Sequence, residues 1–139
     1  MTWVGWSLLS ALFAAATAIL AKVGVRGVNS NLATAIRTSV VVVFAWVVAI
    51  ALDEHGQARS IPSRSWLFLG LSGLATGMSW LCYFRALQLG PASRVAPLDK
   101  LSVVLVIGFA WIFLQERITP MALGGGLLIS LGALMLAFS

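Results

Sequence analysis

Charged residues are scarce in this chain of 139 residues, at 9% of the sequence against the roughly 25% that is usual in soluble domains. Apolar residues make up 60% of the chain, the mean hydropathy is +1.01, and the first 21 residues carry no charge. A water-soluble fold with a single buried core cannot be built from this composition. The sequence therefore predicts an integral membrane protein and excludes a soluble enzyme.

The sequence lacks the residues needed for nucleic-acid binding, disulfide formation, metal binding or ATP binding. The nine Lys and Arg residues give a net charge of +5 but form no basic run, so no nucleic-acid partner is expected. A single cysteine, Cys82, excludes an intrachain disulfide and a thiolate cluster, and the single histidine, His55, has no ligand set around it in the sequence. The sequence holds no ATP-binding loop. We expect neither a metal nor a cofactor.

Five segments are predicted to cross the membrane as helices. A helix needs about 20 residues to span the hydrocarbon core, and two charge-free runs, 38–52 and 101–115, hold only 15. Charges block both runs on their C-terminal side, so each must extend toward its N-terminus. The N-terminal run lacks the basic segment of a cleaved signal and should remain as a helix. The predicted spans of this single all-α transmembrane domain, 1–139, are 3–21, 32–52, 66–87, 95–115 and 119–138.

The two extensions bring charged side chains into the membrane. Arg37 enters with the second span, and Asp99 and Lys100 enter with the fourth. Pro97 would then lie in the first turn of the fourth span, where a missing N–H has no partner to lose. Residues 53–65, the longest connection, are expected to form a solvated loop.

A polar face inside the membrane is the candidate substrate site. Helical spacing places Thr76, Ser79 or Trp80, and Tyr83 on one face of the third span, and Asp99 with Ser102 on one face of the fourth. Ionisable groups within a bilayer usually face a water-filled path or a partner, so these residues with Arg37 could line a substrate cavity, with Asp99 as the ion-coupling group. Two alternatives stay open. Arg37 and Arg85 could reach the membrane surface with their long stems, and Asp99 could form a structural ion pair with Arg37, Arg85 or Lys100.

The last span carries small residues at helix-packing distances. Gly126 and Ser130 form a small-xxx-small pair, and Gly125 and Gly132 are spaced by seven residues. This face is expected to make structural contacts or to contact a second subunit.

The arrangement of basic residues does not fix one orientation in the membrane. An odd number of spans places the two ends of the chain on opposite sides. Outside the spans, three basic residues fall on the side of residue 1 and three on the side of Ser139. Counting the near-edge Arg37, Arg85 and Lys100 makes the second side richer and would place it in the cytoplasm. Both a dual and a fixed topology remain open.

The chain resembles one EamA module of the drug/metabolite transporter superfamily. Residues 70–104 read GLSGLATGMSWLCYFRALQLGPASRVAPLDKLSVV, and residues 113–135 read FLQERITPMALGGGLLISLGALM. The parts that carry the resemblance are Tyr83, Ala86, Leu87, the turn at Pro91-Ala92-Ser93, Glu116, Gly125, Gly132, Lys22 and Arg37. Two positions depart from the pattern, because Val103 stands where a proline is common and Gln115 stands where a glycine precedes the glutamate.

The resemblance implies half of an inverted-repeat transporter, similar to the five-helix bacterial and archaeal group. It implies a secondary, gradient-driven carrier, with export favoured, of a small polar or amphoteric metabolite in the inner (plasma) membrane. One module would recover alternating access as an antiparallel homodimer. The alternatives are a proton-coupled exporter of lipophilic cations and a non-transporting membrane subunit of a larger complex.

Overall fold

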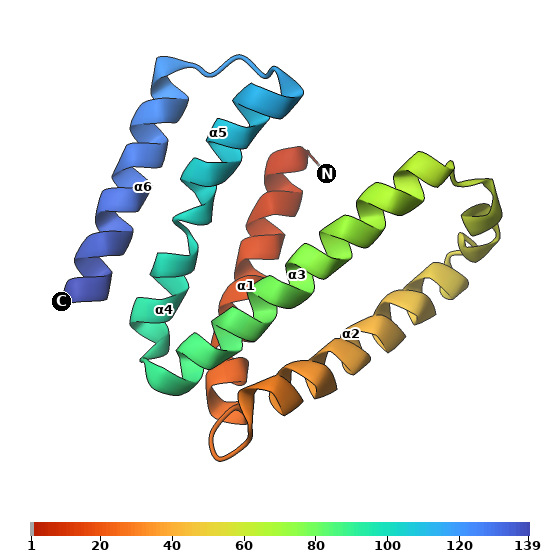
Figure 1. Cartoon of the computed structure of the whole chain (residues 1–139), viewed down its shortest axis with the longest axis horizontal. Helices are drawn as coiled ribbons and strands as arrows, with labels where there is room; N and C mark the ends of the chain where they lie inside the picture. The colour runs from red at the N-terminus through yellow and green to blue at the C-terminus, as the bar shows by residue number, and fades with distance from the viewer. Residues whose placement is uncertain (1) are drawn as a thin grey trace. The chain divides into compact units, whose positions relative to one another are not determined.

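The computed structural model describes residues 2–139, and most of them are helical (Figure 1). The elements are α1 (Trp3–Gly24), α2 (Ser30–Ala51), the 3-10 helix η1 (His55–Ser60), α3 (Ser63–Leu89), α4 (Ala92–Asp99), α5 (Ser102–Leu114) and α6 (Pro120–Phe138). Taken with α4 and α5 as one segment, five helical stretches are long and apolar enough to cross a membrane. The predicted all-α fold with five spans is therefore confirmed.

Local side chains account for where two of these helices begin. The carboxamide oxygen of Asn29 accepts from the N–H groups of Asn31 at 2.9 Å and Leu32 at 3.4 Å, which caps α2. The hydroxyl of Thr119 accepts from the N–H of Ala122 at 3.2 Å, and Pro120 occupies the first position of α6, where no N–H is needed. Both helices thus start with a side-chain cap on their first turn.

The connection between α2 and α3 is more ordered than a plain solvated loop. Residues His55–Ser60 form the 3-10 helix η1, and α3 begins at Ser63, three residues before the predicted start. The His55 Nδ1 atom lies 3.8 Å from Asp53 Oδ1, so a carboxylate does stand beside the histidine. Among the described residues, no group of three or more metal-ligating side chains forms around them.

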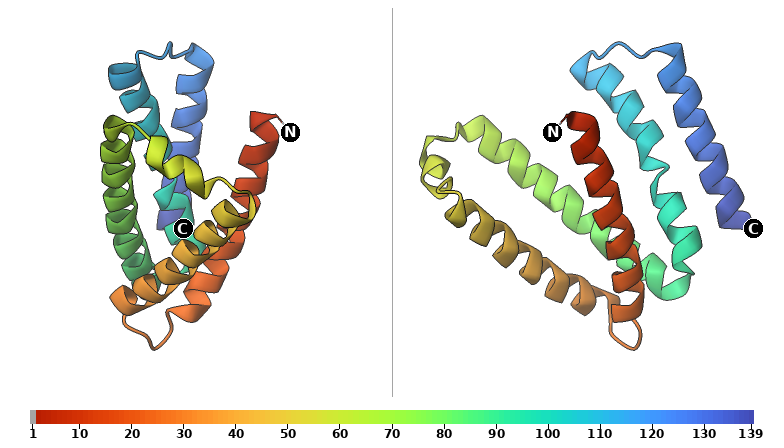
Figure 2. Two further views of the ribbon diagram at one scale, coloured as in Figure 1. Left: turned by 90° about the vertical axis from the view of Figure 1, so that its right-hand side faces the viewer. Right: turned by 180° about the vertical axis from the view of Figure 1, so that it is seen from behind.

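The fourth span is broken, which corrects the sequence prediction of one helix over 95–115. The segment begins at Ala92, so Pro97 lies inside α4 and not in its first turn. Proline has no N–H to donate to the carbonyl of Ser93. After it the backbone tightens, with Lys100 N donating to Pro97 O at 2.9 Å and Leu101 N donating to Leu98 O at 3.0 Å. The interruption between α4 and α5 is visible in the right-hand view of Figure 2.

The chain forms two compact units, which we describe separately. The first comprises residues 2–22 and 89–139, where α6 runs antiparallel to α4 and α5 (Figure 2). Gly126 and Ala133, two turns apart on α6, are buried. A Cβ atom built on Gly126 would lie 3.1 Å from Ile107 Cδ1, so this glycine allows α5 to approach closely. The Lys22 ammonium donates to the carbonyl of Gly90 at 2.8 Å and joins the end of α1 to the turn before α4.

The second unit, residues 23–88, is the antiparallel pair α2 and α3 with η1 between them. The Gln88 side-chain amide donates to the carbonyl of Val28 at 2.6 Å, and Arg85 donates to the Gln88 amide oxygen at 2.9 Å. Val25 and Leu87 are almost fully buried, at 2% and 0% exposed. This end of the unit is therefore fixed by both hydrogen bonds and packing, whereas the other end is closed by the chain itself.

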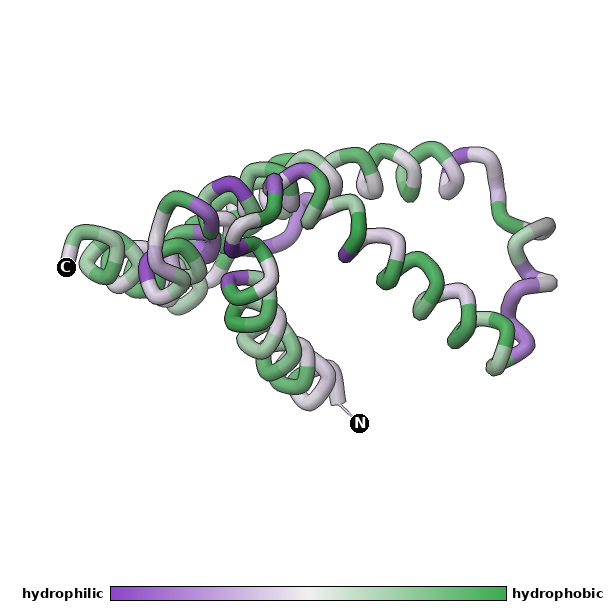
Figure 3. The backbone as a smooth tube through the Cα atoms, turned by 90° about the horizontal axis from the view of Figure 1, so that it is seen from below, coloured by the Kyte–Doolittle hydropathy of each residue, from purple (hydrophilic) through white to green (hydrophobic). Residues whose placement is uncertain are grey.

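Most large apolar side chains point outward on every helix. Figure 3 shows apolar residues along the helices, and polar residues both at the turn between α2 and α3 and at several segments in the centre and left of the view. In water this surface would be unstable, but hydrocarbon solvates it without cost. The protein is a multi-pass membrane protein.

Packing at Gly126 gives a test of the α5 and α6 contact. Replacement by leucine, Gly126→Leu, places a side chain against Ile107 and should lower the free energy of unfolding by about 1–3 kcal/mol. Gly124→Leu, whose Cβ meets nothing within 4 Å, is the control and should have little effect. Denaturant unfolding in detergent micelles measures both variants. Equal losses in the two variants would contradict this packing.

Candidate functional site

The guanidinium of Arg37 is held against the aromatic face of α3. Its Cζ atom lies 4.1 Å from the centroid of the Trp80 ring and 5.5 Å from that of Phe84. A cation above an aromatic ring is attracted by the negative face of the π system, and this attraction grows where water is excluded. Phe84 is only 3% exposed, so one wall of the arrangement is dry.

No carboxylate of the same unit balances this charge. Its two carboxylates, Asp53 and Glu54, follow the C-terminal end of α2. Asp53 is 16 residues beyond Arg37, a distance of ~24 Å along the helix axis. Within residues 23–88 the fixed positive charge therefore has aromatic neighbours and no acidic partner. Such a group can attract the anionic part of a solute.

Sequence reasoning placed Trp80 and Tyr83 near Arg37 but missed Phe84. Tyr83 is half-buried and lies near enough to Arg37 to interact with it electrostatically. Phe84 follows Trp80 by four residues and shares its face of α3, a spacing that could have indicated it. An apolar ring in an apolar span carries no signal of its own, which is why it was overlooked.

The hydroxyls of Thr76 and Ser79 are not joined to this cluster by hydrogen bonds. Thr76 donates to the carbonyl of Ser72 at 2.9 Å. Thr76 and Ser79 are both exposed. Their place in a substrate site remains a prediction from helical spacing. Arg37, Trp80, Tyr83 and Phe84 are the members that the structure brings together.

A groove of about 500 Å³ opens between α2 and α3. Its lining is uncharged, and Arg37 is not part of it. The lining residues are Asn31, Thr34, Ala35, Thr38, Ser39, Val42, Val43, Gly77 and Leu81. Sequence reasoning did not single out this surface, although three hydroxyl side chains within six residues of an apolar span are a signal that could have found it.

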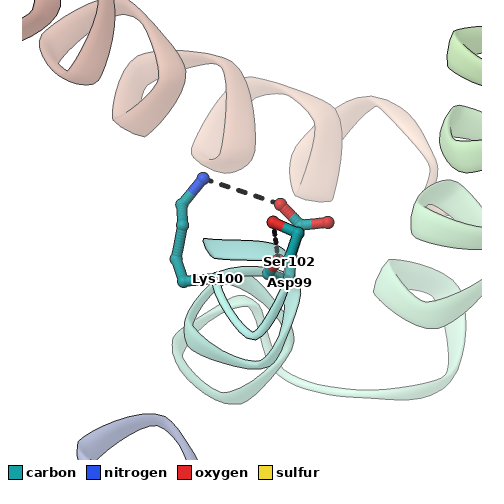
Figure 4. Close-up of polar contacts among 3 residues, drawn as sticks. All are labelled: Asp99, Lys100 and Ser102. Carbon is teal, nitrogen blue, oxygen red and sulfur yellow. Dashed lines mark hydrogen bonds and ion pairs between the residues drawn. The ribbon is translucent and has the colours of Figure 1, made fainter. Parts of the chain in front are cut away.

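Asp99 and Ser102 belong to the other unit and lie at the break between α4 and α5 (Figure 4). Asp99 Oδ2 lies 3.6 Å from Lys100 Nζ, and Ser102 Oγ donates to the Asp99 carbonyl at 2.7 Å. Of the three cations considered as partners of Asp99, the structure pairs it with Lys100. About half of each side chain is accessible, with 41% of Asp99 and 56% of Lys100 exposed. Neither side chain is fully covered by the rest of the described chain.

The small residues of α6 divide into two sets. Gly126 faces α5, and its carbonyl accepts from the Ser130 hydroxyl at 2.9 Å. A Cβ atom built on Gly125 or Gly132 would meet nothing within 4 Å. Gly126 thus makes a contact inside the chain, while Gly125 and Gly132 leave room for a neighbour.

The comparisons with known proteins agree with this arrangement of apolar helices. The model of the EamA-like transporter family matches residues 1–138. This chain belongs to that family. A protein of Sinorhizobium sp, named "Uncharacterized transporter in cobO 3'region", is 54% identical over 136 residues, which cover 98% of this chain and 96% of the relative. No solved structure matches the chain.

The EamA-like match confirms the resemblance seen in the sequence. It covers Arg37 and its aromatic partners as well as the Asp99 and Lys100 pair. The EamA-like protein is a membrane transporter, which distinguishes it from an enzyme, and it works in a lipid bilayer on a small-molecule substrate. Its function is therefore to bind and release a solute.

Proposed function

We propose that this EamA-like protein is a secondary transporter of a small polar or amphoteric metabolite, and that Arg37 binds the anionic group of the solute. The observation that carries the proposal is the position of the Arg37 guanidinium. Its Cζ atom lies 4.1 Å from the centroid of the Trp80 ring, and Arg37 itself belongs to an apolar helix. The resemblance favours export, and the inner (plasma) membrane is the proposed location.

The depth of Arg37 supports a binding role over a purely structural one. It lies seven residues after Ser30, the first residue of α2, or ~10 Å along the helix. A charge at this depth in hydrocarbon is costly unless it is paired or hydrated. The aromatic rings compensate part of that cost, and a solute carboxylate would compensate more, because its hydrogen bonds to a guanidinium are charge-assisted and can be bidentate.

The transporter is proposed to act as an antiparallel homodimer. One module of five spans supplies half of an inverted repeat. A second copy in the opposite orientation would supply the other half, related to the first by a two-fold axis in the membrane plane. The balanced basic residues outside the spans suit a chain that inserts in both orientations. Gly125 and Gly132 of α6, which are open on this chain, are the proposed subunit contact.

Asp99 is the proposed ion-coupling residue. It lies at a helix break inside the fourth membrane segment, and its carboxylate is accessible. Interrupted helices are where transporters place their substrate and ion sites. Protonation of Asp99 would release Lys100 from its ion pair and change the charge of the α4 and α5 junction.

Removing the charge of Arg37 tests the solute-binding role. In proteoliposomes, Arg37→Gln should reduce uptake of phenylacetate by about tenfold to a hundredfold, since a hydrogen-bonded charge contributes roughly 1.5–3 kcal/mol. The native protein should prefer phenylacetate over its neutral amide. The control is Arg85→Gln, which removes an exposed cation bonded to Gln88 and should change uptake little. Similar uptake by Arg37→Gln and the native chain would contradict the binding role.

Orientation is tested with cysteines placed on opposite sides of the membrane. In a Cys82→Ser background, Ser139→Cys and Gly56→Cys are each labelled with an impermeant reagent on intact and then on lysed cells. About half of the molecules should react in intact cells for both variants, because each orientation exposes one of the two sites. Full labelling of one variant and none of the other would show a single fixed orientation and would overturn the homodimer of inverted copies.

Neutralising Asp99 tests ion coupling. Uptake by the native chain should change with pH, and Asp99→Asn should remove that dependence because an amide has no carboxyl proton to lose. Glu116→Gln, in the turn between α5 and α6, serves as the matched carboxyl control and should retain the native profile. Uptake by Asp99→Asn that follows the native pH profile would exclude Asp99 as the coupling residue.

A further inference from the structure

The groove between α2 and α3 presents hydroxyl groups whose hydrogens are already used. Thr34 and Thr38 each donate to the carbonyl four residues earlier at 2.8 Å, and Ser39 does so at 3.1 Å. Each hydroxyl has a single donor but two acceptor lone pairs. The oxygens that line the groove can therefore accept hydrogen bonds but cannot donate them.

The rest of the lining is uncharged, and apart from the carboxamide of Asn31 it is apolar. Val42 and Leu81 supply hydrocarbon from the two helices, and Gly77 leaves space on α3. A volume of about 500 Å³ is in the range of small-molecule sites. None of the described residues that line the groove is a carboxylate, so a bare ammonium would lose its hydration without gaining a counter-ion.

The groove lies beside the Arg37 site on the same helix. Thr34 is three residues before Arg37, and Thr38 directly follows it. Side chains three residues apart on a helix are separated by about 5–6 Å at Cβ. A small solute whose anionic group is bound by Arg37 is long enough to reach the hydroxyl of Thr34.

We infer that this groove binds the uncharged part of the transported solute and selects for an apolar body that carries a neutral O–H or N–H donor. The preferred substrate is then a hydroxylated or amide-bearing monoanion. The inference rests on the proposed binding of the anionic group by Arg37, but it concerns different residues and makes a separate demand on the solute.

The test compares two probes that differ by one hydroxyl, 4-hydroxyphenylacetate and phenylacetate. The native protein in proteoliposomes should take up the hydroxylated probe about three to ten times better, the advantage of one net hydrogen bond. Thr34→Val and Thr38→Val remove the acceptor oxygen with little change of shape. We expect each to reduce this preference toward one, as measured by the ratio of the two uptake rates within the same variant.

Two further variants separate the groove from general effects on helix backbone. Ser39→Ala removes a groove hydroxyl that is bonded to a backbone carbonyl, and it should also lower the preference. Ser7→Ala removes a hydroxyl bonded in the same way to the Trp3 carbonyl on α1, outside the groove, and should leave the preference unchanged. Thr34→Ser keeps the oxygen and should keep the selectivity.

The outcomes distinguish this inference from the proposed function. Loss of phenylacetate uptake in Arg37→Gln together with no preference for the hydroxylated probe would overturn the groove assignment alone. A preference that survives in all groove variants would also overturn it, and this result is expected if a lipid chain or a helix of a second copy fills the groove. Uptake of both probes that is unaffected by Arg37→Gln would instead overturn the proposed function, and absence of uptake of both at millimolar concentration would overturn both.

Discussion

The hydrocarbon core of the bilayer is the constraint on which the whole structure depends. Backbone N–H and C=O groups find no water there, so each must be bonded within its own helix. Five membrane segments satisfy this demand with almost no burial of side chains against one another. The exception is the break between α4 and α5. Pro97 has no N–H to donate there, and the N–H groups of Lys100 and Leu101 donate to the carbonyls three residues earlier, which recovers part of the backbone hydrogen bonding. Irregular backbone at this depth is tolerated where it lines a path or faces protein, which fits the accessible Asp99 beside it.

Because the side chains bury little surface, a few polar bonds near the helix ends carry much of the organisation within each unit. Lys22 binds the carbonyl of Gly90 in one unit, and Gln88 binds the carbonyl of Val28 in the other. These side chains donate to turn carbonyls that would otherwise need a hydrogen-bond donor from the membrane surface. Such bonds hold the helix ends while leaving long apolar faces uncovered. Uncovered faces suit a module that is completed by a partner in the membrane.

The two polar sites of the second unit differ in the kind of group that they can bind. Arg37 offers a cation beside aromatic rings and attracts negative charge, whereas the groove offers hydroxyl oxygens that accept hydrogen bonds, the carboxamide of Asn31, and hydrocarbon. Together they suit the proposed solute, which has one anionic end and one neutral end that donates a hydrogen bond. The proposed selectivity depends on what is missing as much as on what is present, since this unit supplies no carboxylate near either site to balance an ammonium.

The sequence by itself determined the class of protein and the number of spans, because scarcity of charge and the length of apolar runs depend only on composition along the chain. It also indicated the depth of Arg37 and Asp99, since each had to be included for its span to reach the required length. Only the tertiary structure decided which rings surround Arg37, which hydroxyls face the groove, and that Gly126 contacts α5 inside the chain. The tertiary structure also decided that the fourth span breaks after Pro97. Whether a helix starts before a proline or at it depends on the turn that precedes the helix. The physical reason is rotation: large apolar side chains are exposed on every helix, so the few polar residues do not by themselves fix how each helix turns about its axis toward its neighbours. Contacts between residues more than forty positions apart, such as Arg37 with Trp80, then follow from packing.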